Sequence, residues 1–301
     1  KFAAAKFDKI LSMNPELEKV WEAQYALLAS NHSDMFSFSS AFQYCAPLRG
    51  ISYLTQGKQF LFNALIDRIE ASKGDYFEHY QIQSVVPGKL IEIEMKTREG
   101  QMVKVSSRFL IFSTKSDKIS LLFQPSKPAS YSDRFRPVKV IFYPLTLFLG
   151  VHQKCLPQQL ARHVAIVCDI NKSLLNDNLI VLETGWPEKG KEIMDAGIPL
   201  TVTVFLPADE ANWEIEVLKR KADEVMSRLE IFLPFLEENI VYYDLDQSID
   251  LSIACRKLVT PKYHVKNNLF TSFSAKSNKT RYRHIYLTGA SLMADAGFDA
   301  E

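Results

Sequence analysis

Apolar residues recur every three or four positions in several stretches of the chain, which is typical of helices with one buried face. The first thirty residues predict two short helices, and residues 60–69 predict another. That helix is expected to end at Lys73-Gly74, where glycine suits the left-handed conformation that closes many helices. A longer helix is expected over residues 209–232, before Pro234. Its predicted buried face carries Ile215, Leu218, Ala222, Met226 and Leu229.

Elsewhere the apolar pattern has period two or is continuous over a short run, which predicts strands. Residues 76–113 predict one strand, then a meander across the Glu99-Gly100 turn, then a short apolar strand. A loop with two prolines and three serines over residues 123–135 separates this region from a second one that is rich in strands. The expected strands are 76–86, 89–96, 102–106, 109–113, 138–149, 163–169, 179–184, 200–206, 240–245 and 281–288. The pattern therefore predicts a mixed α/β (α+β) fold.

Composition narrows the class of protein. The chain has 301 residues with 47% hydrophobic and 12% aromatic residues, enough for a sizeable core. A net charge of +1 gives no overall electrostatic preference for nucleic acid or for an anionic membrane. The longest apolar stretch, residues 138–151, is too short for a transmembrane helix and contains Lys139 and Pro144. We expect no transmembrane segment and no nucleic-acid partner, while peripheral membrane contact stays open.

The four cysteines are widely spaced, and no CxxC, HExxH or HxH pattern occurs. The sequence therefore indicates neither a metal site nor a disulfide framework, and reduced thiols indicate a cytoplasmic protein. No histidine, serine or acidic pair shows a spacing that predicts a nucleophile beside a base, so the catalytic residues are unknown.

The order of segments resembles the phytoene desaturase and amine oxidase superfamily of flavoproteins. The resemblance rests on the turn at Gly57, the helix ALIDRIE, the strand KGDYFEHYQIQSVV, the meander, the strand FLIFS, a β-rich insert and the closing turn IYLTGAS. The insert, with VIFYPLTLFLGV, HVAIVCDI, NLIVLETG and PLTVTVFLP, is most similar to the phytoene-dehydrogenase-related branch.

The resemblance implies a partial FAD-binding domain and a mixed β-sheet substrate domain flanked by helices. Residues 1–50 would form a helical cap segment, residues 51–115 part of the FAD-binding-like domain, residues 116–274 the substrate-binding sheet domain, and residues 275–301 a return to the first domain. Ile285 should then lie beside the 109–113 strand. The GxGxxG turn of such proteins does not occur in this sequence, which starts in what resembles the region after it. We expect a truncated chain without the N-terminal dinucleotide-binding half.

The resemblance also assigns candidate FAD-binding residues. In such flavoproteins a turn of small residues after the last strand approaches the flavin, and glycine or alanine permits that approach. The alternative for this turn is a packed helix-entry turn. Ile82 matches a strand position whose backbone meets the adenine side, and an ordinary core position is compatible with that role. Gly57 matches the second glycine of a paired-glycine turn, although Gln56 replaces the first, and a plain helix-entry turn explains it equally well. The complete candidate set is Gly57, Ile82, Gly289, Ala290, Ser291, Gly297, Phe298 and Asp299.

The function implied is that of an FAD-dependent oxidoreductase acting on an apolar small molecule, with FAD absent from this chain and the chain inactive alone. FAD would accept hydride while the protein orients the substrate and excludes water. Phe142, Tyr143 and Phe148 are core candidates, some of which could line an apolar cavity. The alternative is a non-enzymatic binding protein on the same fold, similar to dissociation inhibitors that bind lipidated partner proteins.

Overall fold

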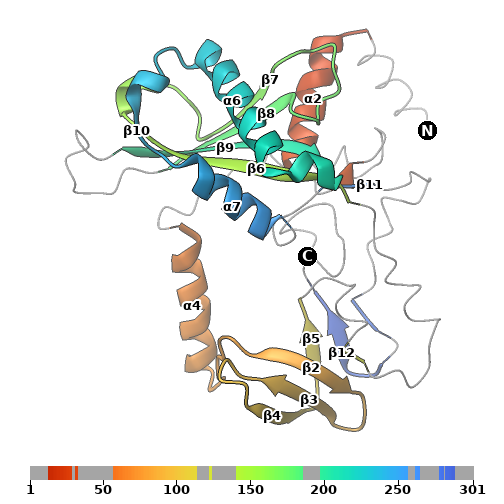
Figure 1. Ribbon diagram of the computed structural model, residues 1–301. Coiled ribbons are helices and arrows are strands. Elements are labelled where there is room, and N and C mark those ends of the chain that lie inside the picture. The colour runs from red at the N-terminus through yellow and green to blue at the C-terminus, as the bar shows by residue number, and fades with distance from the viewer. Residues whose placement is uncertain are drawn as a thin grey trace. The chain divides into compact units, whose positions relative to one another are not determined.

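The computed structural model describes residues 13–28, 31–32, 57–113, 122–123, 140–185, 197–256, 262–264, 278–280 and 282–288 (Figure 1). The chain forms two compact units. Unit 1 comprises Lys1–Ala46 and Val138–Leu269, and unit 2 comprises Pro47–Pro137 and Phe270–Glu301. The mixed α/β fold class is confirmed, because the described residues form four α-helices and three sheets. The four-segment division of the chain stays a prediction.

Unit 1 is built on a seven-stranded sheet with the order β1-β11-β6-β9-β8-β7, in which β10 also pairs with β6. The β1–β11 pair is parallel and the other pairs are antiparallel. β6 and β9 form the longest ladder, from Phe142 opposite Pro207 to Val151 opposite Ile198. The strands are β1 (Asn31–His32), β6 (Val140–Val151), β7 (His163–Val167), β8 (Leu179–Thr184), β9 (Ile198–Pro207), β10 (Ile240–Tyr243) and β11 (Lys262–His264).

Helices cover both faces of this sheet. Successive strand residues point to opposite faces, so Val204 and Phe205 identify the two sides. Val204 packs in a cluster with helix α6 (Ile215–Phe232) and helix α7 (Leu245–Cys255). Phe205 packs in another cluster with helix α2 (Pro15–Leu28). The two clusters therefore lie on opposite sides of the sheet and together form the core of unit 1.

Helix α7 substitutes for a neighbouring strand along part of β6. β11 pairs with the start of β6 and β10 with its end, on the edge opposite β9. Between them, the Ser252 hydroxyl accepts from the N–H of Thr146 and donates to its carbonyl, both at 3.1 Å, and Ser248 accepts from the N–H of Phe148. Pro144 precedes Thr146 by two residues, so its backbone nitrogen points to the same edge of β6. Proline has no N–H, and at this position no described neighbouring strand needs one.

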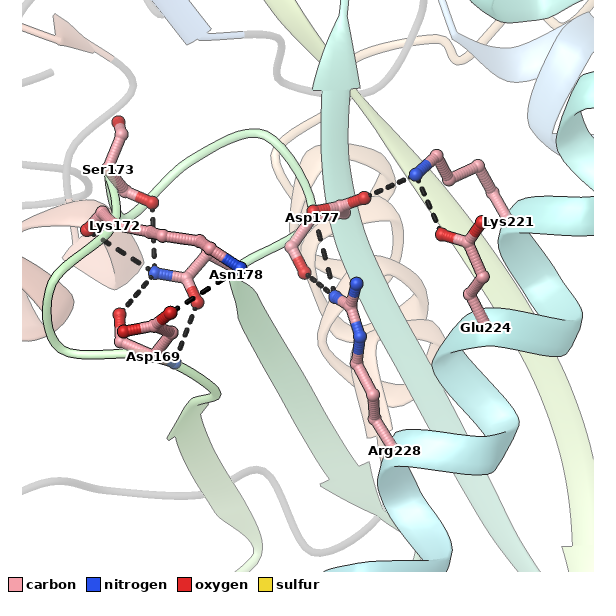
Figure 2. Close-up of polar contacts among 8 residues, drawn as sticks. All are labelled: Asp169, Lys172, Ser173, Asp177, Asn178, Lys221, Glu224 and Arg228. Atoms are coloured by element: carbon pink, nitrogen blue, oxygen red, sulfur yellow. Dashed lines mark hydrogen bonds and ion pairs between the residues drawn. The ribbon is translucent and has the colours of Figure 1, made fainter.

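The loop between β7 and β8 is fixed to the sheet and to α6 (Figure 2). The buried Asn178 amide bonds the backbone of Asp169 on both sides, at 2.8 and 2.9 Å. Asp177 has a left-handed backbone, with φ of 64°. Its carboxylate accepts a hydrogen bond from the ammonium of Lys221 at 2.6 Å. Arg228 donates to the Asp177 carbonyl at 2.7 Å. Two cations of α6 thus hold the loop at one point.

Unit 2 contains a meander of β2 (Gln81–Val86), β3 (Ile91–Lys96) and β4 (Met102–Ser107). Its second sheet is a parallel pair, β5 (Leu110–Phe112) with β12 (Ile285–Leu287). Ile285 is opposite Leu110, which confirms the expected pairing of the last strand with the 109–113 strand. One shared cluster joins the two sheets, with Val85, Ile91, Ile93, Phe112, Phe123, Ile285 and Leu287 at its centre.

Helix α4 (Gly57–Ala71) confirms the predicted helix, but its end differs from the expectation. The left-handed residue is Lys73, with φ of 63°, and Gly74 does not have a positive φ. Glycine at position 74 serves close packing instead. An added Cβ there would lie 2.7 Å from the Ile69 side chain.

Several other boundaries were predicted wrongly. The long helix starts at Ile215 after a short 3-10 turn, η4 (Glu210–Trp213), and Ile215 is half exposed. The predicted strand at 240–245 ends at Tyr243, because Asp244 caps α7 through the N–H of Gln247, and the sequence had not predicted α7. Strand pairing begins only at Gln81 in the 76–86 segment. Two further 3-10 turns are η3 (Gln153–Cys155) and η5 (Glu237–Asn239).

The second predicted N-terminal helix is α2, whereas the first lies outside the described residues, as does nearly all of the 123–135 loop. Within the described part of the chain, every helix is too short or too polar to cross a bilayer.

Candidate functional site

The carboxyl ends of β5 and β12 lie together in unit 2. The strands are parallel and Leu287 is opposite Phe112, so the two segments leave the sheet at the same end, at Ser113 and Thr288. We call this end of the two strands the carboxyl edge. The N–H of Thr288 donates to the carbonyl of Phe112 at 2.7 Å, which extends the ladder to this edge. In open α/β sheets, ligands bind outside the carboxyl ends of parallel strands. This edge is therefore the candidate site.

The packing beneath this edge is firm. Ile285 and Leu287 are 1% and 5% exposed, and they share a cluster with Phe112 and Phe123. Phe123 stacks on Tyr282 with ring centroids 4.9 Å apart. Side chains that are locked in this way hold the backbone of β12 in place up to Thr288.

The side of β12 that faces away from β5 is also hydrogen-bonded. The N–H of Leu287 donates to the carbonyl of Asn278 at 2.8 Å, and the Thr280 hydroxyl donates to the carbonyl of Ile285 at 2.8 Å. β12 is thus an inner strand between β5 and residues 278–280. An inner strand is held by hydrogen bonds along both of its sides.

Most of the predicted FAD-binding residues lie outside the described residues. These are Gly289, Ala290, Ser291, Gly297, Phe298 and Asp299, so their roles stay predictions. Residues 289–291 directly follow Thr288 at the edge described above. The structure describes the two other candidates, Gly57 and Ile82, and among the described contacts none joins them.

Ile82 combines a core side chain with a backbone irregularity. It lies on β2 opposite Met95, and the register shifts before Ser84, so that Gln83 is an extra residue. The bulge keeps Ile82 and Val85 on the same face, three residues apart, and the Ile82 side chain packs against the core cluster of unit 2. The side chain follows the core interpretation, and a contact of the Ile82 backbone with adenine stays a prediction.

Gly57 begins helix α4 with φ of +75°, a conformation that favours glycine. A Cβ added there would meet nothing within 4 Å. The backbone conformation explains why position 57 is a glycine, and no described neighbour approaches closely enough to require one. This agrees with the plain helix-entry interpretation.

The described residues at the candidate edge do not by themselves form an evident FAD site. Backbone amides, carbonyls and hydroxyls are the groups that can hydrogen-bond the neutral edges of a flavin or an adenine. A pyrophosphate needs several amides at a helix N-terminus, usually with a glycine-rich turn, and these 301 residues contain no GxGxxG. A fit of the residues at this edge to the flavin or adenine ring stays a prediction.

The three aromatic residues of the 138–151 strand have different environments. Phe142 packs with the α2 cluster, and Tyr143 meets Trp213 edge to face with centroids 5.6 Å apart. Phe148 is 42% exposed, on the face of the sheet opposite α6. Of the three, Phe148 is the most exposed and is the candidate for contact with a ligand.

Among the described cations, Lys262 has the most strongly shifted pKa, and no pattern in the sequence indicates this. Its side chain is buried, and its ammonium donates to the carbonyl of Ala26 in the last turn of α2. The ammonium also lies 5.0 Å from the centre of the Phe205 ring. Burial lowers the pKa of Lys262 to about 8. Since its contacts bind α2 to the sheet, we assign it a structural role.

Other buried ionisable groups are not activated. Burial raises the pKa of the Cys155 and Cys168 thiols, and Arg228 only partly offsets this at Cys168. Burial and, to a lesser extent, Asp223 raise the pKa of Tyr243 to about 12. Thiols and phenols of this kind stay protonated at neutral pH, so they are poor nucleophiles. Within the described ranges, no group of three or more His, Cys, Asp or Glu residues could hold a metal ion.

Comparison with known proteins gives only distant structural similarity. No protein-family model and no curated protein matches the chain. Among solved structures, the chain is similar to a flavoprotein/dehydrogenase from Cytophaga hutchinsonii, with 12% identity and a TM-score of 0.39 over 77% of this chain and 46% of that chain. It is also similar to a CLA-producing fatty acid isomerase from P. acnes, with 9% identity and a TM-score of 0.41 over 78% of this chain and 52% of that chain. The chain spans about half the length of these two structures, and similarity at this level assigns neither a reaction nor a site.

Proposed function

We propose that the chain is part of an FAD-dependent oxidoreductase of the phytoene desaturase-like type that acts on an apolar substrate. The observation that carries the proposal is the parallel pairing of β5 with β12. It joins segments about 175 residues apart in the sequence, in the order that the resemblance implies. It also places Thr288, the residue before the proposed 289–291 turn, at the carboxyl edge of the sheet, where ligands of such sheets bind.

The proposed roles of the protein are to bind and orient. The turn at Gly289, Ala290 and Ser291 would approach the flavin ring, and the approach to a following helix at Gly297, Phe298 and Asp299 would face the same ring. The backbone of Ile82 would contact the adenine side. Bound FAD would supply hydride acceptance, which is consistent with the unactivated side chains of the described part.

Binding by these 301 residues alone is expected to be weak. A pyrophosphate held by backbone amides gains several charge-assisted hydrogen bonds, each worth roughly 1.5 to 3 kcal/mol. Losing them lowers affinity by several powers of ten. Since these 301 residues contain no GxGxxG turn, we expect FAD to bind reversibly and to be lost during purification, and we expect the chain to be inactive alone.

The apolar nature of the substrate rests on the resemblance and on one exposed side chain. Phe148 lies on β6, on the sheet face opposite α6, and is flanked along the strand by Thr146. Thr146 and Thr203 bond each other across the sheet at 3.1 Å on this same face. A face with one exposed aromatic ring and satisfied hydroxyls can accept an apolar molecule without leaving buried polar groups unpaired.

A flavin titration of the purified chain tests the proposal. Flavin fluorescence should be quenched saturably by the chain, and Gly289→Val should weaken this quenching because a branched side chain blocks the approach of the backbone to a planar ring. Gly150→Ala is a suitable control, because its new Cβ would have only ordinary contacts, the nearest at 3.4 Å from Tyr242. The control should bind flavin as the unmodified chain does.

The same titration separates the oxidoreductase from a non-enzymatic binding protein. A dissociation-inhibitor-like protein that binds lipidated partners would bind a prenylated peptide and show no saturable flavin quenching. Binding of flavin without binding of such a peptide supports the oxidoreductase, and the reverse result supports the binding protein.

A further inference from the structure

We draw no further inference here: the strongest candidate, the exposed apolar face of helix α4 in unit 2 that carries Phe62, Leu65 and Ile69, supports none because nothing in the structure shows what covers it.

Discussion

The hydroxyl of Ser252 lies 3.1 Å from both the backbone nitrogen and the carbonyl oxygen of Thr146. Through this contact a helix side chain takes the place of a strand along the open part of the β6 edge. Ser252 is 6% exposed and Ser248, one turn earlier, is 2% exposed. Two buried serines on one face of α7 therefore satisfy backbone groups that β10 and β11 leave unpaired.

Ser252→Ala should destabilise unit 1. The substitution removes the one hydroxyl that bonds both the N–H and the carbonyl of Thr146 at a partly buried edge. An unsatisfied buried backbone group costs about 1 to 3 kcal/mol. We expect the free energy of unfolding to fall by about 1 to 3 kcal/mol in urea. Tryptophan fluorescence can follow this, because all three tryptophans of the chain, at positions 21, 186 and 213, belong to unit 1.

Ser227→Ala is the matched control for that variant. The exposed Ser227 hydroxyl donates to the carbonyl of Asp223, one turn earlier in α6. Its removal should change the free energy of unfolding by less than about 0.5 kcal/mol. Equal effects of the two substitutions would show that the Ser252 hydroxyl is not needed to satisfy the backbone groups at the edge of β6.

Asp177→Ala should cost more than Asp177→Asn. Alanine loses the ion pair with Lys221 and also disfavours the left-handed backbone, which costs about 1 kcal/mol. Asparagine tolerates that backbone and loses only the charge. A charge-assisted bond at this partly buried carboxylate contributes about 1.5 to 3 kcal/mol. We expect a loss of about 2 to 4 kcal/mol for alanine and roughly half of that for asparagine, measured by urea unfolding.

The control for Asp177 is Asp246→Ala, which breaks the exposed pair with Lys219. Surface pairs of this kind contribute about 0 to 1 kcal/mol. If Asp177→Ala were as mild as Asp246→Ala, the loop between β7 and β8 would not depend on the cations of α6.

Lys262 should make unit 1 more stable as the pH rises. Its folded pKa of about 8 lies below the ordinary value of 10.5, so the unfolded chain binds more protons between these values. The cost of burying the charge is fully present below about pH 8 and is relieved as the pH approaches 10.5. Relative to Lys262→Met, the free energy of unfolding of the unmodified chain should rise by about 2 to 3 kcal/mol from pH 7 to pH 10.

Lys219→Met serves as the control for the pH series. The pKa of Lys219 is raised by its bond to Asp246, so its proton is retained over the same range. The difference between Lys219→Met and the unmodified chain should stay flat from pH 7 to pH 10. A flat difference for Lys262→Met as well would mean that its ammonium is solvated in the folded chain.

The hydrophobic pattern predicted several strands well, including β8, which is buried on both faces. β8 begins and ends where the pattern predicted, and β3 and β4 each differ by one or two residues. The pattern missed α7, because two of its buried positions are the serines that bond β6, and serine breaks an apolar period. It placed Ile215 in the core, although the 3-10 turn before α6 leaves that residue in the first turn and half exposed.

Contacts between distant segments could not be predicted from the pattern. The period of two indicates a strand but not its partner, so the pairing of Ile285 with Leu110 was predicted only from the order of segments in a resembling family. Nothing in the sequence around Lys262 indicated a buried ammonium, since its partner Ala26 lies 236 residues away. Of the candidate cofactor residues, the structure describes only Gly57 and Ile82.

The central claim is that the turn after β12 approaches a flavin, and a flavin titration combined with an absorbance scan tests it most directly. The purified 301-residue chain should lack the visible flavin bands, quench added flavin saturably but weakly, and lose that quenching on Gly289→Val with an unchanged melting temperature. Stoichiometric FAD that survives purification would contradict our account of the pyrophosphate. The central claim would be contradicted if Gly289→Val left the quenching unchanged. A large fall in melting temperature with unchanged flavin binding would also contradict it, and would mean that the turn has only a structural role.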